Sequence, residues 1–419
     1  MSDSSISYVK VMEIWFPYGI SEVPVRVPDE NLVDILQARQ VENPPTLGFD
    51  GPMLDDLVTA AKIADRIVVV AGESRNQETS SGAINYLIGK LTQVGISLSS
   101  LTILRAFKAA EISGTPSDVQ VVTHSPQTST TIRLDQSTEF APSINSLIGG
   151  NTLTVVVGEL RLNHMLGISG FCDAIFPGLA SEASAHQQLI RNKPMEPHEI
   201  VKERLELTSN LPNIYGLGFV LNSELAPIEI HHGKFNETVE KLSTTLRRVS
   251  TTQASRPADI VVMSVGGSPL DESLLTAVES FPAGLSVLKR NGALIVAAEC
   301  SAGLGGTDFY AWAKEQKEAR HLETRLRHRF NYYGWKAAYL LRALNNHRIY
   351  LVSTIPDHHL EHTFGLKPAK TMNAAVQAAQ RALGSDASIS VVPNASLVVP
   401  TITQPTQDNP KDEAGSDEK

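Results

Sequence analysis

The chain has 419 residues, of which 42% are hydrophobic, 6% aromatic and 19% charged. This composition is that of a folded globular protein, and the length favours two or three domains. The formal net charge of −9 at pH 7 makes nucleic acid a poor partner, because the chain has no general positive field to gather phosphate groups.

The two cysteines, Cys172 and Cys300, are too few for a disulfide framework or a thiolate metal cage, so we expect two buried free thiols. The N-terminal residues lack the charged and then apolar pattern of a secretory signal. No apolar run reaches the roughly 18 residues that a membrane span needs. We therefore expect a cytoplasmic protein.

The first half of the chain predicts a domain in which apolar strands alternate with helices. An amphipathic helix over 53–65 precedes a buried strand over 66–71, and a helix over 78–95 ends at Gly95. Further strands are predicted over 101–106, 119–123, 152–158, 217–222 and 228–231. Such alternation is typical of a parallel sheet covered on both faces.

The second half predicts a smaller α/β unit, reached through a helix over 236–249 and a polar connector that contains Pro257. Its strands are predicted over 259–265, 293–298, 348–353 and 389–399, and its helices over 270–280, 308–316, 335–345 and 371–383. The tail after residue 403 is polar and has no aromatic residue, which predicts disorder. The predicted domains are thus 1–255 and 256–402, followed by a disordered tail over 403–419.

The stretch over 155–181 is the first of four candidate sites at strand ends, where ligands collect in open α/β sheets. An apolar strand runs into Asn163 and His164, and the turn that follows contains Gly167, Ser169 and Gly170. Glycines allow backbone amides to approach a ligand, and the histidine could act as acid, base or metal ligand. A tight turn with a structural histidine is the alternative.

The other three candidates also follow predicted strands. In 264–271 (SVGGSPLD), a glycine pair precedes a helix start that suits an anion, although a plain capping turn is the alternative. The glycines of 297–309 lack the spacing of a dinucleotide fingerprint, which disfavours a simple NAD oxidoreductase. Arg75 could clamp a carboxylate or phosphate by two parallel hydrogen bonds, or be a solvated surface residue.

Six segments between residues 10 and 402 resemble segments of the nickel-dependent lactate racemase family, and they occur in the same order. The similarity lies in EIWFPYG, GISGFCDAIFPGLAS, SVGGSPLDESLLTAVES, AAECSAGLGGTDFY, NYYGWKAAYLLRALNNHRIYLVS and ISVVPNASLVVP. The resemblance implies two α/β domains with mostly parallel sheets and an active-site cleft between them. It also implies an isomerase that racemises or epimerises a small 2-hydroxy acid by reversible hydride transfer to a nickel-pincer nucleotide, assisted by two acid–base histidines.

Carried onto this sequence, the family pattern implies catalytic roles for His164 and Arg75 and a metal-binding role for His186. The residues implied at the cofactor are Ser74, Gly167, Ser169, Gly170, Asp173, Gly266, Gly267, Pro269, Asp271 and Trp335.

The chain also departs from the family pattern. The lysine that attaches the cofactor falls on Asp173, the second catalytic histidine falls on Asn163, and the nickel histidine falls on Leu189. The first catalytic histidine is absent beside Lys108 and Ala109, and a glutamine and a lysine of the family become Thr276 and Glu279. Two functions therefore stay open: a racemase or epimerase of 2-hydroxy acids, or a diverged family member without pincer chemistry that binds a small acid or regulates.

Overall fold

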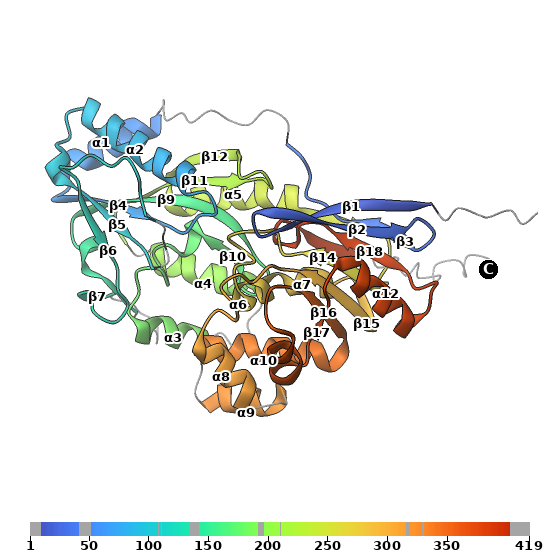
Figure 1. Cartoon of the computed structure of the whole chain (residues 1–419). Helices are drawn as coiled ribbons and strands as arrows, with labels where there is room; N and C mark the ends of the chain where they lie inside the picture. Colours follow the sequence, from blue (N-terminus) through green and yellow to red (C-terminus); the bar gives the residue numbers. More distant parts are fainter. Residues whose placement is uncertain are drawn as a thin grey trace, which may run out of the picture.

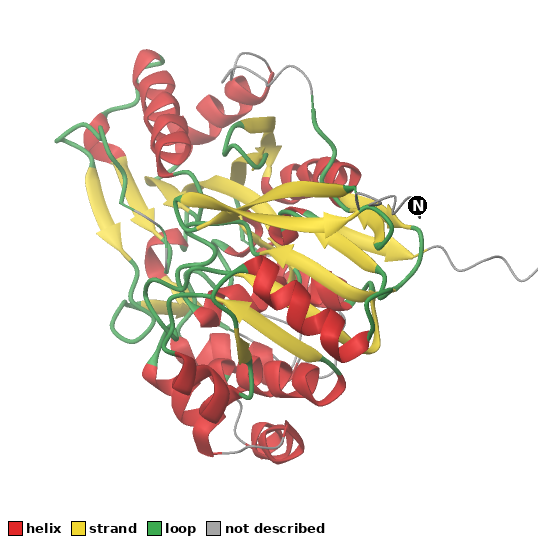
Figure 2. Cartoon of the chain, turned by 45° about the vertical axis from the view of Figure 1, so that its right-hand side comes forward, coloured by secondary structure: helices red, strands yellow, loops and turns green. Residues whose placement is uncertain are grey.

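The computed structural model describes residues 10–41, 52–107, 109, 111–134, 142–191, 197–209, 211–315, 319–328 and 331–402. The chain forms two lobes, and each is built on a mostly parallel β-sheet (Figure 1). Helices lie around both sheets, as Figure 2 shows in red around yellow strands. The predicted fold class, two α/β domains with mostly parallel sheets, is confirmed.

The first lobe contains a seven-stranded sheet in the order β12-β11-β9-β4-β5-β6, with β10 paired to β9. Its strands are β4 (Arg66–Ala71), β5 (Leu101–Arg105), β6 (Gln120–Thr123), β9 (Thr152–Asn163), β10 (Gly167–Gly170), β11 (Ile214–Leu221) and β12 (Pro227–Lys234). Only β10 and β12 run antiparallel to their neighbours among these strands. The central strands are buried on both faces, which explains their continuous apolar sequence.

The helices of this lobe are α1 (Pro52–Ile63), α2 (Gln77–Gln93), α3 (Glu182–Arg191), α4 (Pro197–Ser209) and α5 (Phe235–Ser250). Two short strands, β7 (Thr131–Arg133) and β8 (Ser143–Asn145), form a separate antiparallel pair. Helices α3 and α4 are not among the predicted elements, because their sequences are polar and lack a long apolar stripe.

The second lobe contains a six-stranded sheet in the order β17-β16-β15-β14-β18-β3, in which every pair is parallel. Its strands are β3 (Leu32–Ile35), β14 (Ala258–Ser264), β15 (Leu288–Ala297), β16 (Arg348–Val352), β17 (Lys367–Pro368) and β18 (Ile389–Val392). Its helices are α6 (Leu274–Ala277), α7 (Phe281–Leu285), α8 (Thr307–Glu315), α9 (Ala319–His328), α10 (Tyr332–Asn346), α11 (Asp357–His359) and α12 (Met372–Leu383). The helix predicted over 270–280 begins only at Leu274, because Ser273 and Thr276 form a capping box there.

The N-terminal segment belongs to the second lobe, which corrects the predicted first domain of 1–255. Strand β3 pairs with β18, and the hairpin of β1 (Val11–Tyr18) and β2 (Ser21–Pro28) lies beside that sheet (Figure 1). Phe16, Val25 and Val27 on the hairpin are fully buried in one cluster with apolar residues of β14, β15 and β18. A strand's sequence does not tell which sheet it will join, so the chain order alone misplaced these residues. A second crossing joins β13 (Thr251–Ala254) to β19 (Val399–Ile402), and the tail over 403–419 lies outside the described residues.

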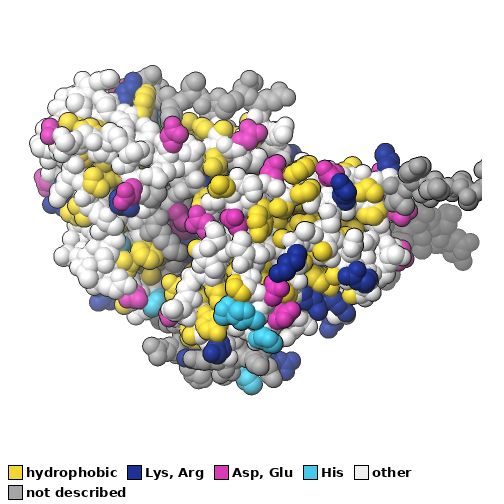
Figure 3. All heavy atoms as spheres, in the orientation of Figure 1, with side chains coloured by type: hydrophobic (Ala, Val, Ile, Leu, Met, Phe, Trp, Pro, Cys, Tyr) yellow, Lys and Arg dark blue, Asp and Glu magenta, His cyan; other side chains and the backbone are white. Residues whose placement is uncertain are grey.

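Cys172 and Cys300 are both buried and free, as predicted. None of the described helices combines the length and hydropathy needed to cross a membrane. On the face shown in Figure 3, basic and acidic side chains are interspersed, without a continuous basic patch.

Candidate functional site

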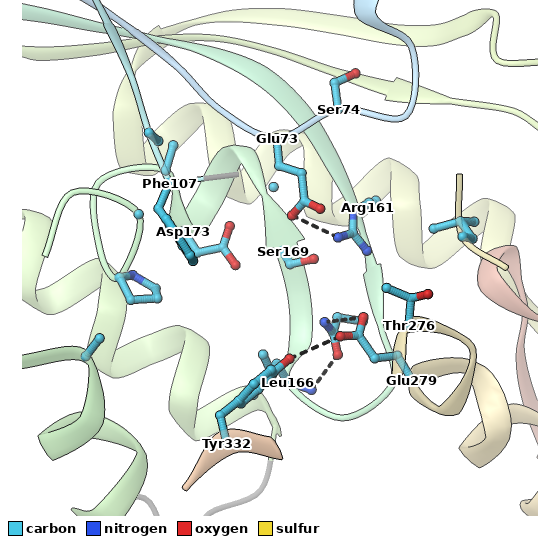
Figure 4. A pocket seen from close by; sticks show the side chains of 18 of the residues that line it. Glu73, Ser74, Phe107, Arg161, Leu166, Ser169, Asp173, Thr276, Glu279 and Tyr332 are labelled. Carbon is cyan, nitrogen blue, oxygen red and sulfur yellow. Dashed lines mark hydrogen bonds and ion pairs between the residues drawn. The ribbon is translucent and has the colours of Figure 1, made fainter. Parts of the chain in front are cut away.

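A cavity of about 580 Å³ lies between the two lobes and is lined by residues from both. Glu73 and Arg161 reach it from the carboxyl ends of β4 and β9, whereas Glu279 and Tyr332 reach it from the second lobe (Figure 4). Strand ends of this kind are where open α/β sheets bind ligands. The volume suits a small molecule rather than a polymer.

The floor of the cavity is the hairpin formed by β9 and β10. Strand β9 continues to Asn163, beyond the predicted end at residue 158, and Ser169 of β10 stands directly opposite Arg161 of β9. The side-chain oxygen of Asn163 accepts hydrogen bonds from the backbone nitrogens of Met165 and Leu166, which closes the turn at the tip. Cross-strand partners share a face of a sheet, so Arg161 and Ser169 lie side by side.

Gly170 ends β10 with a φ of +83°, and a Cβ built there would lie 2.2 Å from the backbone oxygen of Glu159. We expect Gly170→Ala to lower the free energy of unfolding by about 2–4 kcal/mol, because it combines left-handed strain with a clash against backbone. Chemical denaturation measures the change. The matched control is Gly89→Ala on α2, where nothing lies within 4 Å; equal effects of the two substitutions would contradict the assigned role of Gly170.

Arg75, the predicted carboxylate clamp, lines the cavity but is already paired with a protein carboxylate. Its Nε donates to Glu159 at 2.7 Å, and its backbone nitrogen donates to the other oxygen of Glu159 at 2.7 Å. The side chains of Arg75 and Glu159 are only 5% and 0% exposed. This pair therefore fixes the loop after β4 against β9.

Two more ion pairs face the cavity. Arg161 donates to Glu73 at 3.0 Å, and Arg204 of α4 lies 3.5 Å from Asp173. Burial raises the pKa of Asp173 to about 6, although the charge of Arg204 acts in the opposite direction. Burial lowers the pKa of the Arg161 guanidinium, but the nearby carboxylates, Glu73 foremost, more than offset this and raise it, so Arg161 stays charged.

Glu279 joins the two lobes at the opposite wall of the cavity. Its carboxylate accepts a hydrogen bond from Tyr332 of the second lobe (Figure 4). It also accepts from Asn163 of the first lobe and from Lys336 of the second. Lys336 is only 2% exposed, so its charge is compensated inside the protein. Burial and the neighbouring Glu279 raise the pKa of Tyr332 well above its ordinary value.

His164, the predicted acid or base, also lines the cavity and contacts the second lobe. Its Nε2 lies 2.8 Å from the carbonyl oxygen of Ala395 and must donate to it, because a carbonyl only accepts. Burial lowers the pKa of His164 below its ordinary value. The ring is therefore neutral near pH 7, and Nδ1 is the nitrogen left to accept a proton.

The structure brings eight of the predicted site residues to the cavity: Ser74, Arg75, His164, Ser169, Gly170, Asp173, His186 and Pro269. Gly167, Gly266, Gly267, Asp271 and Trp335 are not among its lining residues.

Most of these five residues have contacts elsewhere. The carboxylate of Asp271 accepts from the backbone nitrogen of Gly19 at 2.8 Å, and a Cβ on Gly267 would lie 2.9 Å from the oxygen of Gly19. This segment thus holds the turn between β1 and β2. Trp335 packs against the apolar cluster around Met165 at the junction of the lobes.

The sequence reading missed Glu73, Arg161, Arg204 and Tyr332. Polar and apolar residues alternate in the segment ELRLN, over 159–163. If the strand is continued past residue 158, this alternation places residues 161 and 163 on one face, which could have indicated Arg161. Arg204 gave no such signal, since α4 was not predicted and a charged residue is rarely as buried as this one.

The fold and the cavity together define a two-lobed α/β protein with a candidate small-molecule site between its lobes. A model of the lactate racemase C-terminal domain matches residues 253–399. The lactate racemase of Thermoanaerobacterium thermosaccharolyticum is 25% identical over 427 aligned positions, which cover 92% of this chain and 98% of the relative. The lactate racemase of Lactiplantibacillus plantarum is 24% identical over 270, covering 60% of this chain and 62% of the relative.

Solved structures agree with this likeness. The lactate racemase apoprotein from Thermoanaerobacterium thermosaccharolyticum superposes with a TM-score of 0.79 at 24% identity, over 94% of this chain and 100% of that one. A protein from Thermotoga maritima gives a TM-score of 0.58 at 14% identity, over 84% and 97% of the two chains. Residues 253–399 thus match the lactate racemase C-terminal domain, and the chain is similar to lactate racemases over most of its length.

The residues of this cavity do not fit a covalently held nickel-pincer nucleotide. Asp173, at the position that the resemblance gives to the attachment lysine, is a carboxylate paired with Arg204 and offers no amine for the linkage. Across the described part of the chain, no group of three or more His, Cys, Asp or Glu side chains is arranged to hold a metal ion. His186, the predicted metal ligand, lines the cavity.

Proposed function

We propose that this protein binds a small 2-hydroxy acid in the cavity between its lobes and acts on it as a racemase or epimerase, without a covalently attached pincer nucleotide. The lactate racemases to which it is similar support the substrate class. The cavity of about 580 Å³, lined by acid and base groups from both lobes, is the observation that carries the proposal.

The chain's own residues can hold and move protons in the cavity. Asp173, with its pKa of about 6, can hold a proton on a carboxyl oxygen or accept one near neutral pH. His164 can accept a proton only at Nδ1, since Nε2 is committed to Ala395. The hydrogen bond from Asn163 to Glu279 joins the two lobes at the cavity, and Tyr332 of the second lobe donates to the same carboxylate.

A second candidate is a family member that binds small acids without turning them over. The pairing of Asp173 with Arg204 favours it, because this pair takes the place of the group that would attach the cofactor.

Three measurements on the purified full chain separate these functions. Chiral chromatography of a panel of D- and L-2-hydroxy acids measures interconversion, calorimetry measures binding, and intact mass with metal analysis detects a bound nucleotide or nickel. Interconversion by a chain of unmodified mass supports the first candidate, and binding without interconversion supports the second. If no acid in the panel binds, both candidate functions are refuted. A covalent nucleotide adduct would contradict the statement that no pincer nucleotide is attached.

We expect the affinity for an anionic 2-hydroxy acid to fall as the pH rises through about 6, the pKa of Asp173. Below that pH Asp173 is neutral and tolerates a nearby anion, whereas above it the ionised carboxylate repels the ligand. Calorimetry between about pH 5 and pH 8 should show a decrease of roughly three- to tenfold. The pH dependence should disappear in Asp173→Asn; if it persists unchanged, Asp173 is not the titrating group.

A cytoplasmic location forms part of the same proposal, and the two free buried thiols are its support.

A further inference from the structure

Among the described residues, four ion pairs have at least one member that lines the cavity, and their side chains differ in exposure. In three of them the side chains are at most 19% exposed: Arg75 with Glu159, Arg204 with Asp173, and Lys336 with Glu279. In the fourth, Arg161 is 13% exposed but Glu73 is 40% exposed. The Glu73 carboxylate is thus the one with ready access to water.

The hydrogen bonds show the same contrast. In the described structure Glu159 accepts two hydrogen bonds from Arg75, and Glu279 accepts hydrogen bonds from Asn163, Tyr332 and Lys336. Among the described residues, Glu73 accepts one side-chain bond, from Arg161. Rotation of Glu73 into solvent therefore breaks one side-chain contact, whereas removing Glu159 or Glu279 breaks several.

The hydroxyl of Ser169 is a second, independent indication that the cavity binds a ligand. Its hydroxyl is buried, and it has no hydrogen-bond partner within the described part of the protein. It stands opposite Arg161 in the β9–β10 ladder, lines the cavity, and lies in Figure 4 between Asp173 and Arg161. A buried hydroxyl without a partner is costly, so a ligand that bonds to it gains affinity.

Resting on the proposed function, we propose that Arg161 and Ser169 form the carboxylate-binding subsite for the substrate, and that Glu73 occupies this subsite until the ligand carboxylate displaces it. The exchange replaces one carboxylate by another beside the same guanidinium, so the charge balance of the cavity is kept. Arg161 can then bind the ligand through two parallel N–H groups, and Ser169 donates to the same carboxylate or to the 2-hydroxyl.

In this arrangement Glu73 competes with the ligand carboxylate for Arg161, so removing the charge of Glu73 should strengthen ligand binding. Calorimetry of the full chain with L-lactate, D-lactate and larger 2-hydroxy acids should show binding about 10- to 100-fold weaker in Arg161→Met. Glu73→Gln should bind the acids severalfold more tightly, because the glutamine amide competes less well for the guanidinium. The uncharged analogue lactamide should bind more weakly than lactate to the natural chain and gain nothing from Glu73→Gln.

Ser169→Ala separates a ligand-binding role from a structural one. It should weaken lactate binding by about three- to tenfold while leaving the melting temperature unchanged or slightly raised, because it removes a buried hydroxyl that lacks a partner. Arg161→Lys should retain part of the affinity, since lysine keeps the charge but loses the planar fork. If Arg161→Met fails to fold, as judged by circular dichroism, Glu73→Gln and Arg161→Lys still decide the question.

The control is Arg342→Met, which removes an exposed arginine paired with Glu323 on the surface and should leave binding unchanged. Binding by the natural chain that is unaffected by Arg161→Met and Arg161→Lys, or weakened by Glu73→Gln, overturns the assignment of the subsite and leaves the proposed function intact. Absence of binding by the natural chain refutes the proposed function itself, and the subsite with it.

Discussion

Glu159→Ala is expected to lower the free energy of unfolding by about 3–5 kcal/mol, because it leaves the guanidinium of Arg75 buried without its counter-charge. The carboxylate of Glu159 is fully buried and accepts from both the side chain and the backbone nitrogen of Arg75. Urea denaturation followed by circular dichroism measures the loss.

The control for this experiment is Glu13→Ala. Glu13 pairs with Arg26 at 2.9 Å, but the side chains are 39% and 68% exposed, so its removal should cost less than about 1 kcal/mol. Glu159→Gln should fall between the two, since the amide keeps one acceptor. A loss from Glu159→Ala as small as that of the control would show that the Arg75 pair does not hold the loop after β4.

Lys336→Met is expected to cost a similar amount, about 3–5 kcal/mol, because it strands the carboxylate of Glu279 at the junction of the lobes. Combining it with Glu279→Leu should cost much less than the sum of the two single changes, since an apolar pair replaces a buried ionic one. The same denaturation experiment, arranged as a double-mutant cycle, measures this coupling. Strict additivity of the two changes would mean that the pair contributes no interaction of its own.

The sequence predicted the sheets well because their central strands are continuously apolar. Val68, Val69 and Val70 are all fully buried in β4, and the predicted range of that strand matches the observed one. The polar helices α3 and α4 carry no comparable pattern, and they supply Arg204, whose importance depends on a contact between distant parts of the chain.

The sequence indicated strand ends that line the cavity, but it did not indicate how their side chains pair. Arg75 and His164, which follow two of these strands, both line the cavity. The structure pairs Arg75 with Glu159, 84 residues away, and Glu279 with Lys336, 57 residues away. Spacing along the sequence does not reveal such distant ion pairs. Glu279, at a position where the resemblance implies a lysine, is paired with Lys336 of α10.

The position of β3 has a consequence for how this protein can be divided and assembled. Because β3 forms the outer edge of the second sheet, that lobe is made from segments that precede and follow the first lobe in the sequence. A fragment that begins at residue 253, where the match to the C-terminal domain starts, would present an uncovered strand β18 and lose the hairpin that buries Phe16. Excising the lobe as an independent unit thus invites aggregation, and a ribosome must release nearly the whole chain before this lobe can close.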